Sequence, residues 1–205
     1  MPTKMKLHWS PKSPYVRKVM ICLHELSMVD RVEKVRSVAA MLKPNASIMQ
    51  DNPLSKIPTL TTVDGMVIYD SVVICEYLDT LAQGKIFPSD QFQKWQALRW
   101  HALGDGLLDV LILWRNERER EHALPTLMDA FELKFNACLN LLDKEVKALS
   151  AAPFSIGTLT LGCALGYADY RFAHLNWQDH HIELATWYLQ LCNRPSFEAT
   201  APVDG

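Results

Sequence analysis

A nine-residue stretch, together with a residue pair that follows it, has the composition to hold a small charged peptide. The stretch is Asn52-Pro53-Leu54-Ser55-Lys56-Ile57-Pro58-Thr59-Leu60, and the pair is Asp70-Ser71. An X-Pro bond loses little by being cis, and proline is tolerated at the first residue of a strand. A cis bond at Ile57-Pro58 would hold the backbone of Ile57 out for pairing with an added extended peptide. The alternative is that Pro58 only begins an edge strand.

The residues that follow predict a hairpin and then a helix. Thr59-Val63 and Met66-Tyr69 are rich in β-forming residues, and the Asp64-Gly65 step between them is a strong hairpin signal. Either residue of Asp70-Ser71 can cap a helix that continues through Val72-Leu78. The unpaired N–H groups in the first turn of such a helix attract a carboxylate.

These motifs resemble the glutathione-binding signature of the cytosolic glutathione transferases. The match consists of Asn52-Pro58, the hairpin, and the helix that opens at Asp70-Ser71 and ends in Glu76-Tyr77-Leu78-Asp79. Near the N-terminus, Ser13-Pro14-Tyr15-Val16-Arg17-Lys18 is similar to bacterial members of the superfamily. The resemblance covers essentially the whole chain. It implies a thioredoxin-like α/β glutathione-binding domain at 1–81, a linker at 82–89 and an all-α substrate-binding domain at 90–205.

The order of the predicted elements agrees with that fold class. Met5-Trp9 alternates like a strand, Ser13-Pro14 begins a helix that ends near Leu26, and Val32-Arg36 is a second strand. With the hairpin and its helix, this order suits a thioredoxin-like sheet that has helices on both faces. Residues 38–51 are ambiguous between one and two short helical turns.

Only helical patterns follow the Gly- and Pro-containing segment 83–89. One runs from Trp95 to Ile112, and another from Leu124 to Leu149. Ser155 begins the next helix, and Thr158 stands where the superfamily usually has the Asp of a capping box. We therefore expect a weaker version of that cap.

The thiol of glutathione attacks only as the thiolate, and two serines are candidates to stabilise it. A free thiol titrates near pH ~8.5, and a transferase must lower that pKa by roughly two units, about 2.7 kcal/mol. A hydroxyl donor at a helix N-terminus supplies a hydrogen bond and a favourable dipole. By resemblance, Ser13 stands at the active cysteine of the omega-like classes, and Ser10 matches the serine of theta- and zeta-like classes. We favour Ser13 because its capping position is the more defined.

The resemblance also implies how the rest of glutathione is held. Ile57 would pair its backbone with the cysteinyl part, and Asp70 and Ser71 would bind the γ-glutamyl end. Lys56 would meet the glycyl carboxylate, although a solvated loop lysine is an equal interpretation. Asp105 is a hypothesis for an acid that crosses a dimer interface to the glutathione ammonium.

The helical domain is expected to supply the wall for the second substrate. Trp114, Arg115 and Arg118 follow the long apolar helix at a turn-like spacing, and either arginine would attract an anionic electrophile. The competing interpretation is a solvated helix end, because residues 115–121 carry mixed charges.

Composition limits the function classes that remain. The chain has 205 residues and a formal net charge of −2, which gives no reason to expect nucleic acid or an anionic membrane as a partner. No apolar run is long enough to span a bilayer, and the N-terminus lacks an apolar signal core, so we expect a cytoplasmic location. His8, His24 and His101 show no partnered cluster, so no metal or catalysis is assigned to them. The cysteines show no CxxC spacing and are expected to be reduced core thiols: Cys22, Cys75, Cys138, Cys163 and Cys192.

The sequence predicts a homodimeric glutathione transferase with a role in detoxification. It would conjugate the thiolate of glutathione to a small electrophile. Glutathione is its co-substrate, and no other cofactor is expected. With serine in place of the omega-type cysteine, no thiol is expected at the site to form a mixed disulfide with glutathione. One alternative is a non-catalytic binding or regulatory protein with the same fold. Another is a glutathione-dependent isomerase, whose zeta-like Ser-Ser-Cys motif is absent at Ser10-Pro11-Lys12.

Overall fold

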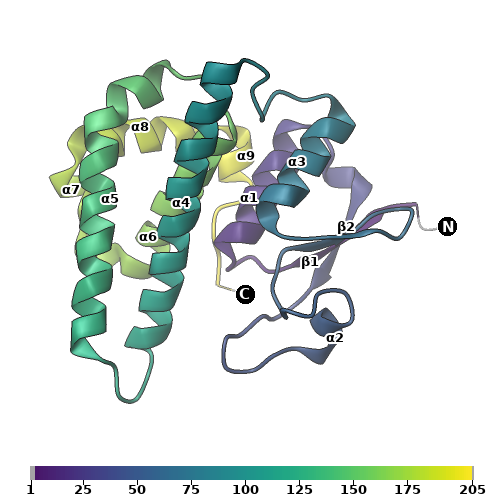
Figure 1. Ribbon diagram of the computed structural model, residues 1–205, viewed down its shortest axis with the longest axis horizontal. Helices are drawn as coiled ribbons and strands as arrows, with labels where there is room; N and C mark the ends of the chain where they lie inside the picture. The colour runs from purple at the N-terminus through teal and green to yellow at the C-terminus, as the bar shows by residue number, and fades with distance from the viewer. Residues whose placement is uncertain (1–2, 205) are drawn as a thin grey trace. The chain divides into compact units, whose positions relative to one another are not determined.

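A computed structural model describes residues 3–204, and these form two compact units (Figure 1). The first unit runs to Phe87 and includes the segment from Ser196 onward, and the second is Pro88–Pro195. The first unit contains the sheet, and the second is helical. Within residues 3–204, no helix is both long and apolar enough to cross a membrane.

The first unit is built on a four-stranded sheet in the order β2-β1-β3-β4. β1 pairs in parallel with β2 and antiparallel with β3, and β3 pairs antiparallel with β4. The predicted strands and hairpin are confirmed, with a shorter hairpin than the β-rich runs suggested. The strands are β1 (Met5–Trp9), β2 (Val32–Arg36), β3 (Thr59–Thr61) and β4 (Val67–Ile68).

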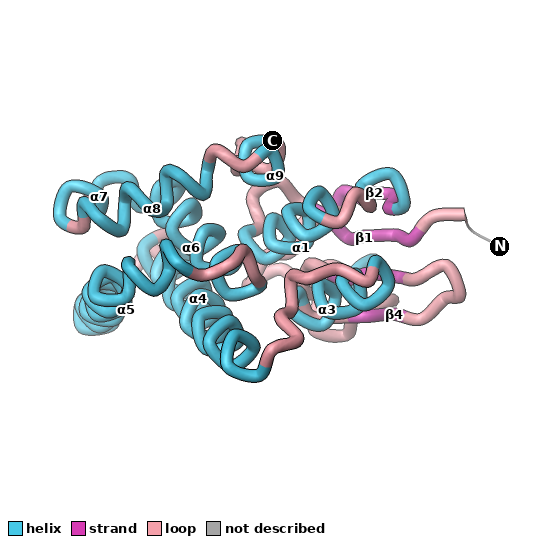
Figure 2. The backbone as a smooth tube through the Cα atoms, turned by 90° about the horizontal axis from the view of Figure 1, so that it is seen from above, coloured by secondary structure: helices cyan, strands magenta, loops and turns pink. Residues whose placement is uncertain are grey.

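Two helices pack against each other on one face of this sheet. They are α1 (Pro14–Glu25) and α3 (Ser71–Ala82), and Figure 2 shows them side by side. The short α2 (Ala46–Met49) lies on the other side of the sheet in Figure 1 and accounts for the ambiguous region. A short 3-10 turn (Val29–Arg31) precedes β2, and α9 (Pro195–Glu198) lies near the C-terminal end of the chain.

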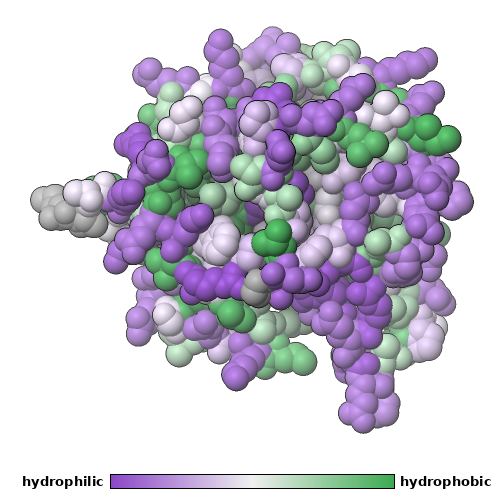
Figure 3. Space-filling model, turned by 180° about the vertical axis from the view of Figure 1, so that it is seen from behind, coloured by the Kyte–Doolittle hydropathy of each residue, from purple (hydrophilic) through white to green (hydrophobic). Residues whose placement is uncertain are grey.

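The apolar face of α1 forms the core of this unit, as its helical spacing predicts. Val16, Val19 and Leu23 are buried, and Leu7 of β1 and Leu60 of β3 are fully buried with them. The face of the molecule in Figure 3 is mainly hydrophilic, with hydrophobic residues in small separate groups. Burying the apolar side chains is the main favourable contribution to folding of the unit.

The helical unit is organised around one central helix, α6 (Ile156–Phe172), nearly all of which is buried. α6 packs along α4 (Gln91–Arg118), and their close approach depends on glycine. A Cβ on Gly157 would lie 2.5 Å from the carbonyl oxygen of Ala97, which is too short for any side chain. The remaining helices are α5 (Pro125–Ala151), a 3-10 turn (Ala173–Leu175), α7 (Trp177–His180) and α8 (Ile182–Cys192).

The cap of α6 forms without the usual acid. The Ser155 N–H donates to the Thr158 hydroxyl oxygen at 2.9 Å, and that hydroxyl donates to the Ser155 carbonyl at 3.1 Å. Threonine therefore occupies the capping-box position through its hydroxyl.

Candidate functional site

Three loops of the first unit meet at one end of the sheet. β1 runs antiparallel to β3 with His8 opposite Thr59, so the loop after β1 lies beside the segment before β3. β3 runs antiparallel to β4 with Leu60 opposite Ile68, so the loop after β4 reaches the same end. The predicted glutathione residues of this unit lie on these three loops or at the first residue of the helix that follows: Ser10, Ser13, Lys56, Ile57, Pro58, Asp70 and Ser71.

Ser13 is the N-cap of α1, as the sequence predicts. Its Oγ accepts the N–H of Val16 at 3.2 Å, and Pro14 occupies the first helical position. This bond uses only a lone pair of the hydroxyl, and the Ser13 proton has no acceptor among residues 3–204. The half-buried Ser13 therefore keeps a donor at the positive end of a 12-residue helix.

Ser10 lies on the turn that leads into α1. Its carbonyl accepts the Ser13 N–H at 3.3 Å, and its Oγ accepts the Lys12 N–H at 3.4 Å. Ser10 is half-buried, and its hydroxyl proton also has no acceptor in the described part of the chain. Two hydroxyl donors, three residues apart, are therefore available at this end of the sheet.

The Ile57-Pro58 peptide bond is cis, as the motif suggested. Neither the backbone N–H nor the C=O of the half-buried Ile57 has a hydrogen-bond partner within residues 3–204. A free donor and acceptor on one residue are what an extended peptide needs for main-chain pairing. The side chain of the neighbouring Lys56 is exposed, and no carboxylate of the described residues pairs with its ammonium.

Asp70, rather than Ser71, is the N-cap of α3. The Asp70 carboxylate accepts the N–H of Val72 at 3.1 Å, and a cis bond joins Tyr69 to Asp70. Ser71 is the first residue of α3 and is 2% exposed, yet its hydroxyl has no partner among the residues that the structure describes. The positive ends of α1 and α3 thus lie at the same end of the sheet, which favours bound carboxylate and thiolate groups there.

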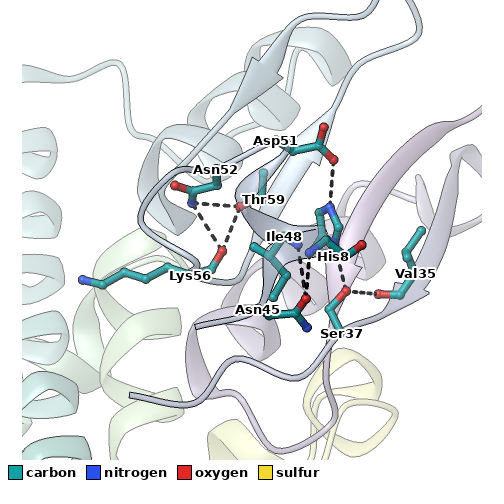
Figure 4. A network of polar contacts seen from close by, with 10 residues as sticks. His8, Val35, Ser37, Asn45, Ile48, Asp51, Asn52, Lys56 and Thr59 are labelled. Carbon is teal, nitrogen blue, oxygen red and sulfur yellow. Dashed lines mark hydrogen bonds and ion pairs between the residues drawn. The ribbon is translucent and has the colours of Figure 1, made fainter. Parts of the chain in front are cut away.

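His8 has partners that the sequence did not reveal, so the expectation of an unpartnered histidine is wrong. Its Nδ1 lies 2.8 Å from the Oγ of Ser37, and its Nε2 lies 2.9 Å from a carboxylate oxygen of Asp51 (Figure 4). These partners are 29 and 43 residues away along the chain, a separation at which no sequence pattern signals contact. His8 therefore joins β1 to both ends of the segment that contains α2.

His101 is also partnered, contrary to expectation. Its Nδ1 lies 3.0 Å from the Thr160 hydroxyl oxygen, and its Nε2 lies 3.6 Å from the Asp105 carboxylate one turn further along α4. Asp105, the hypothetical ligand of the glutathione ammonium, therefore has a histidine on its own helix as an ion-pair partner.

Trp114 is buried in the helical unit. It is 4% exposed, and its ring centroid lies 4.8 Å from that of Phe172 and 6.1 Å from that of Phe135. These contacts join α4, α5 and α6, so the ring contributes to the core that the three helices share.

The two arginines that follow Trp114 form contacts within the same unit. Arg115 donates to the hydroxyl oxygen of Tyr167 at 3.1 Å, and an ion pair of 3.7 Å links it to Glu119. Arg118 donates to the carbonyl of Arg171 at 3.2 Å and lies over the ring of Phe172. Both guanidinium groups are therefore held against α6 or their own helix.

No cysteine lies on the three loops. In the first unit, Cys22 and Cys75 are fully buried, and the Cys22 thiol points to the Cys75 carbonyl at 3.8 Å. The hydrogen bond that links Cys22 to Cys75, and then burial, raise the pKa of Cys22 well above the usual thiol value. Residues 3–204 contain no group of three or more His, Cys, Asp or Glu side chains placed to hold a metal ion.

Known proteins are similar to this chain in sequence and in fold. Residues 12–81 match the family model for the glutathione S-transferase N-terminal domain. A glutathione transferase family member from Pseudomonas fluorescens Pf-5, solved with bound glutathione, is 39% identical, with a TM-score of 0.93 over 98% of this chain and 100% of that one. A glutathione S-transferase from Methylobacillus flagellatus KT, solved with GSH bound, is 34% identical, with a TM-score of 0.87 and the same coverage.

A curated relative extends the match along nearly the whole chain. The uncharacterized GST-like protein YibF of Escherichia coli K12 is 28% identical over 203 residues, which cover 97% of this chain and 98% of that protein. A thioredoxin-like unit joined to an all-α unit defines the glutathione transferase fold. The chain belongs to the glutathione transferase superfamily.

Proposed function

We propose that this protein is a glutathione transferase that binds glutathione where the three loops meet and joins its thiolate to a small electrophile. The observation that carries the proposal is the free backbone N–H and C=O of Ile57, at the same sheet end as the uncommitted Ser13 hydroxyl. The relatives from Pseudomonas and Methylobacillus that hold glutathione support it.

Each part of the tripeptide has a complementary group on the loops. The cysteinyl backbone pairs with the N–H and C=O of Ile57. The γ-glutamyl carboxylate meets the N-terminus of α3 and the Ser71 hydroxyl, and its ammonium meets the exposed carboxylate of Asp70. The glycyl carboxylate pairs with the ammonium of Lys56, which has no other acid beside it among the described residues.

Ser13 supplies the chemical assistance. Its hydroxyl proton donates to the sulfur, which stabilises the thiolate, and the thiol proton leaves to solvent. The sulfur lone pair then forms a C–S bond with the electrophile. A chloroarene releases chloride with its bonding pair, whereas an α,β-unsaturated carbonyl shifts the π pair of its C=C bond toward the carbonyl and then takes up a proton from solvent. Lowering the thiol pKa by roughly two units requires about 2.7 kcal/mol, which a charged hydrogen bond and a helix dipole together can supply.

The helical unit supplies the wall for the electrophile, with Arg115 and Arg118 as the source of positive charge and Trp114 as part of the apolar framework. The protein works in the cytoplasm as a homodimer, in which Asp105 of one subunit contributes to the glutathione ammonium site of the other.

Binding and turnover measured together test this function. Isothermal titration with reduced glutathione is expected to show one site per chain, and an activated chloroarene or an α,β-unsaturated carbonyl is expected to be consumed at a glutathione-dependent rate. Binding without turnover across a panel of electrophiles would point to a non-catalytic binding protein. Absence of glutathione binding would overturn the proposal.

A further inference from the structure

Asn52 is a buried polar residue at the start of the loop that carries Ile57. It is 1% exposed, so each polar atom of its side chain requires a partner. Its Oδ1 accepts the N–H of Leu54 at 3.0 Å, and its Nδ2 donates to the Thr59 hydroxyl oxygen at 3.0 Å and to the Lys56 carbonyl at 3.3 Å. The side chain thus spans both ends of the loop.

The Lys56 carbonyl receives a second donor from the other end of the loop. The hydroxyl of Thr59, a residue that is 0% exposed, donates to it at 2.9 Å. Figure 4 shows this carbonyl facing Asn52 and Thr59, while the Lys56 side chain extends away from them. Two buried donors therefore hold one carbonyl oxygen in a fixed direction.

That direction determines where the next N–H points. The peptide bond between Lys56 and Ile57 is trans, and in a planar trans peptide the C=O and the following N–H point in opposite directions. Because Asn52 and Thr59 hold the Lys56 carbonyl toward the buried side of the loop, the Ile57 N–H faces away from it. This N–H has no partner among the described residues, so it is an oriented, unoccupied donor.

We infer that Asn52 and Thr59 are positioning residues for glutathione: they hold the Lys56–Ile57 peptide so that the Ile57 N–H is ready to donate to the cysteinyl part of the tripeptide. This rests on the proposed function. Ordering the donor before the ligand arrives removes an entropy cost from binding. Neither side chain touches glutathione in this account, and neither changes the ionisation of its thiol.

A comparison of two threonines tests this inference. Thr59→Val removes the hydroxyl but keeps the shape, and Thr59→Ser keeps the hydroxyl. Thr62→Val is the matched control, because Thr62 is 2% exposed and bonds to Met66 in the hairpin turn at the opposite end of β3. We expect Thr59→Val to raise the glutathione Kd about five-fold, the effect of one net hydrogen bond, with kcat at saturating glutathione and the kinetic thiol pKa unchanged. Thr59→Ser and Thr62→Val are expected to keep the wild-type Kd.

A second measurement keeps the test independent of one variant's folding. The Ile57 amide of the wild-type protein, followed by NMR, is expected to exchange rapidly with solvent when free and to become protected when glutathione binds. Asn52→Ala is expected to weaken both the affinity and this protection, in the direction of Thr59→Val.

The outcomes separate this inference from the proposed function. If the wild-type protein binds no glutathione, both are wrong. If it binds glutathione but Thr59→Val binds it equally tightly, or Thr62→Val weakens binding as much as Thr59→Val does, only the positioning role is wrong. An Ile57 amide that stays unprotected in the complex would also overturn it.

Discussion

The Asp51 carboxylate lies 2.9 Å from the Nε2 of His8, and this contact fixes the residue immediately before Asn52 to the central strand β1. The Nδ1 of His8 lies 2.8 Å from the Ser37 hydroxyl oxygen, which is also 3.1 Å from the Val35 carbonyl oxygen. One imidazole therefore contacts residues at both ends of the segment that contains α2. The loop that carries Ile57 therefore starts from a fixed point.

Replacing His8 is expected to destabilise the first unit. His8 is 8% exposed, and His8→Phe leaves the buried Ser37 hydroxyl and the partly exposed Asp51 carboxylate without this partner, so the free energy of unfolding should fall by about 1–3 kcal/mol. Urea denaturation measures this. His180→Gln, at an exposed position on α7, is the control and should leave the midpoint unchanged. Equal midpoints for His8→Phe and the wild type would contradict the bridging role.

Lys56 is expected to recognise the glycyl carboxylate alone. Lys56→Ala should weaken glutathione binding about two- to five-fold, as expected for an exposed ion pair. It should not change the affinity for glutathione esterified at the glycyl carboxylate, because that ligand lacks the charge. Lys43→Ala, on the loop before α2, is the comparison variant. The assignment would be wrong if Lys56→Ala weakened binding of both ligands equally.

Glu145 on α5 makes the stability of the helical unit depend on pH. It accepts hydrogen bonds from Arg99 and from the Trp100 indole of α4, and the bond from Arg99 lowers the pKa of Glu145 below its usual value near 4.5. The contribution is therefore fully present above pH 4.5 and is lost as the pH falls through the lowered folded-state pKa. Because Arg99 is half exposed, we expect Glu145→Gln to cost only about 0.5–1 kcal/mol at pH 7. The difference should vanish in strong acid; a constant difference at every pH would contradict this.

The buried cysteines are expected to resist alkylation in the native protein. Cys22, Cys75 and Cys163 are fully buried. The pKa of Cys22 is raised by its hydrogen bond with Cys75 and by burial. Burial also raises the pKa of the half-buried Cys138. Peptide mapping after brief iodoacetamide treatment at pH 7 should find these sites unlabelled until urea is added. Rapid native labelling of Cys22 would mean that the core of the first unit opens readily.

Local signals in the sequence predicted the elements and the ends of the site. Ser13-Pro14 marks a helix start, Asp64-Gly65 marks a hairpin, and the cis bond at Pro58 follows from a motif, because each depends on neighbouring residues only. The hydrogen-bond network that supports the loop carrying Ile57 could not be predicted from neighbouring residues. The sequence motif does not reveal the role of Asn52 and Thr59, because their buried hydrogen bonds depend on how the loop folds back.

Contacts between elements that are distant in the sequence could not be predicted from local patterns. Asp79 on α3 accepts hydrogen bonds from the backbone N–H groups of Ile86 and Phe87, each at 3.0 Å, and so anchors part of the segment 82–89, for which the sequence indicates only a linker. In the helical unit, the spacing of Trp114 after an apolar helix fits either a core or a pocket wall, and its burial depends on helices α5 and α6.

A crystal structure with reduced glutathione would test the central claim most directly. We expect the tripeptide to lie between the three loops, with its cysteinyl backbone paired to Ile57 and its sulfur within ~3.3 Å of the Ser13 Oγ, a normal donor distance for that large atom. Ser13→Ala should then raise the kinetic pKa of the bound thiol, while Ser10→Ala leaves it unchanged. A sulfur held by Ser10 would move the catalytic role to that residue, and a tripeptide bound away from Ile57 would contradict the account.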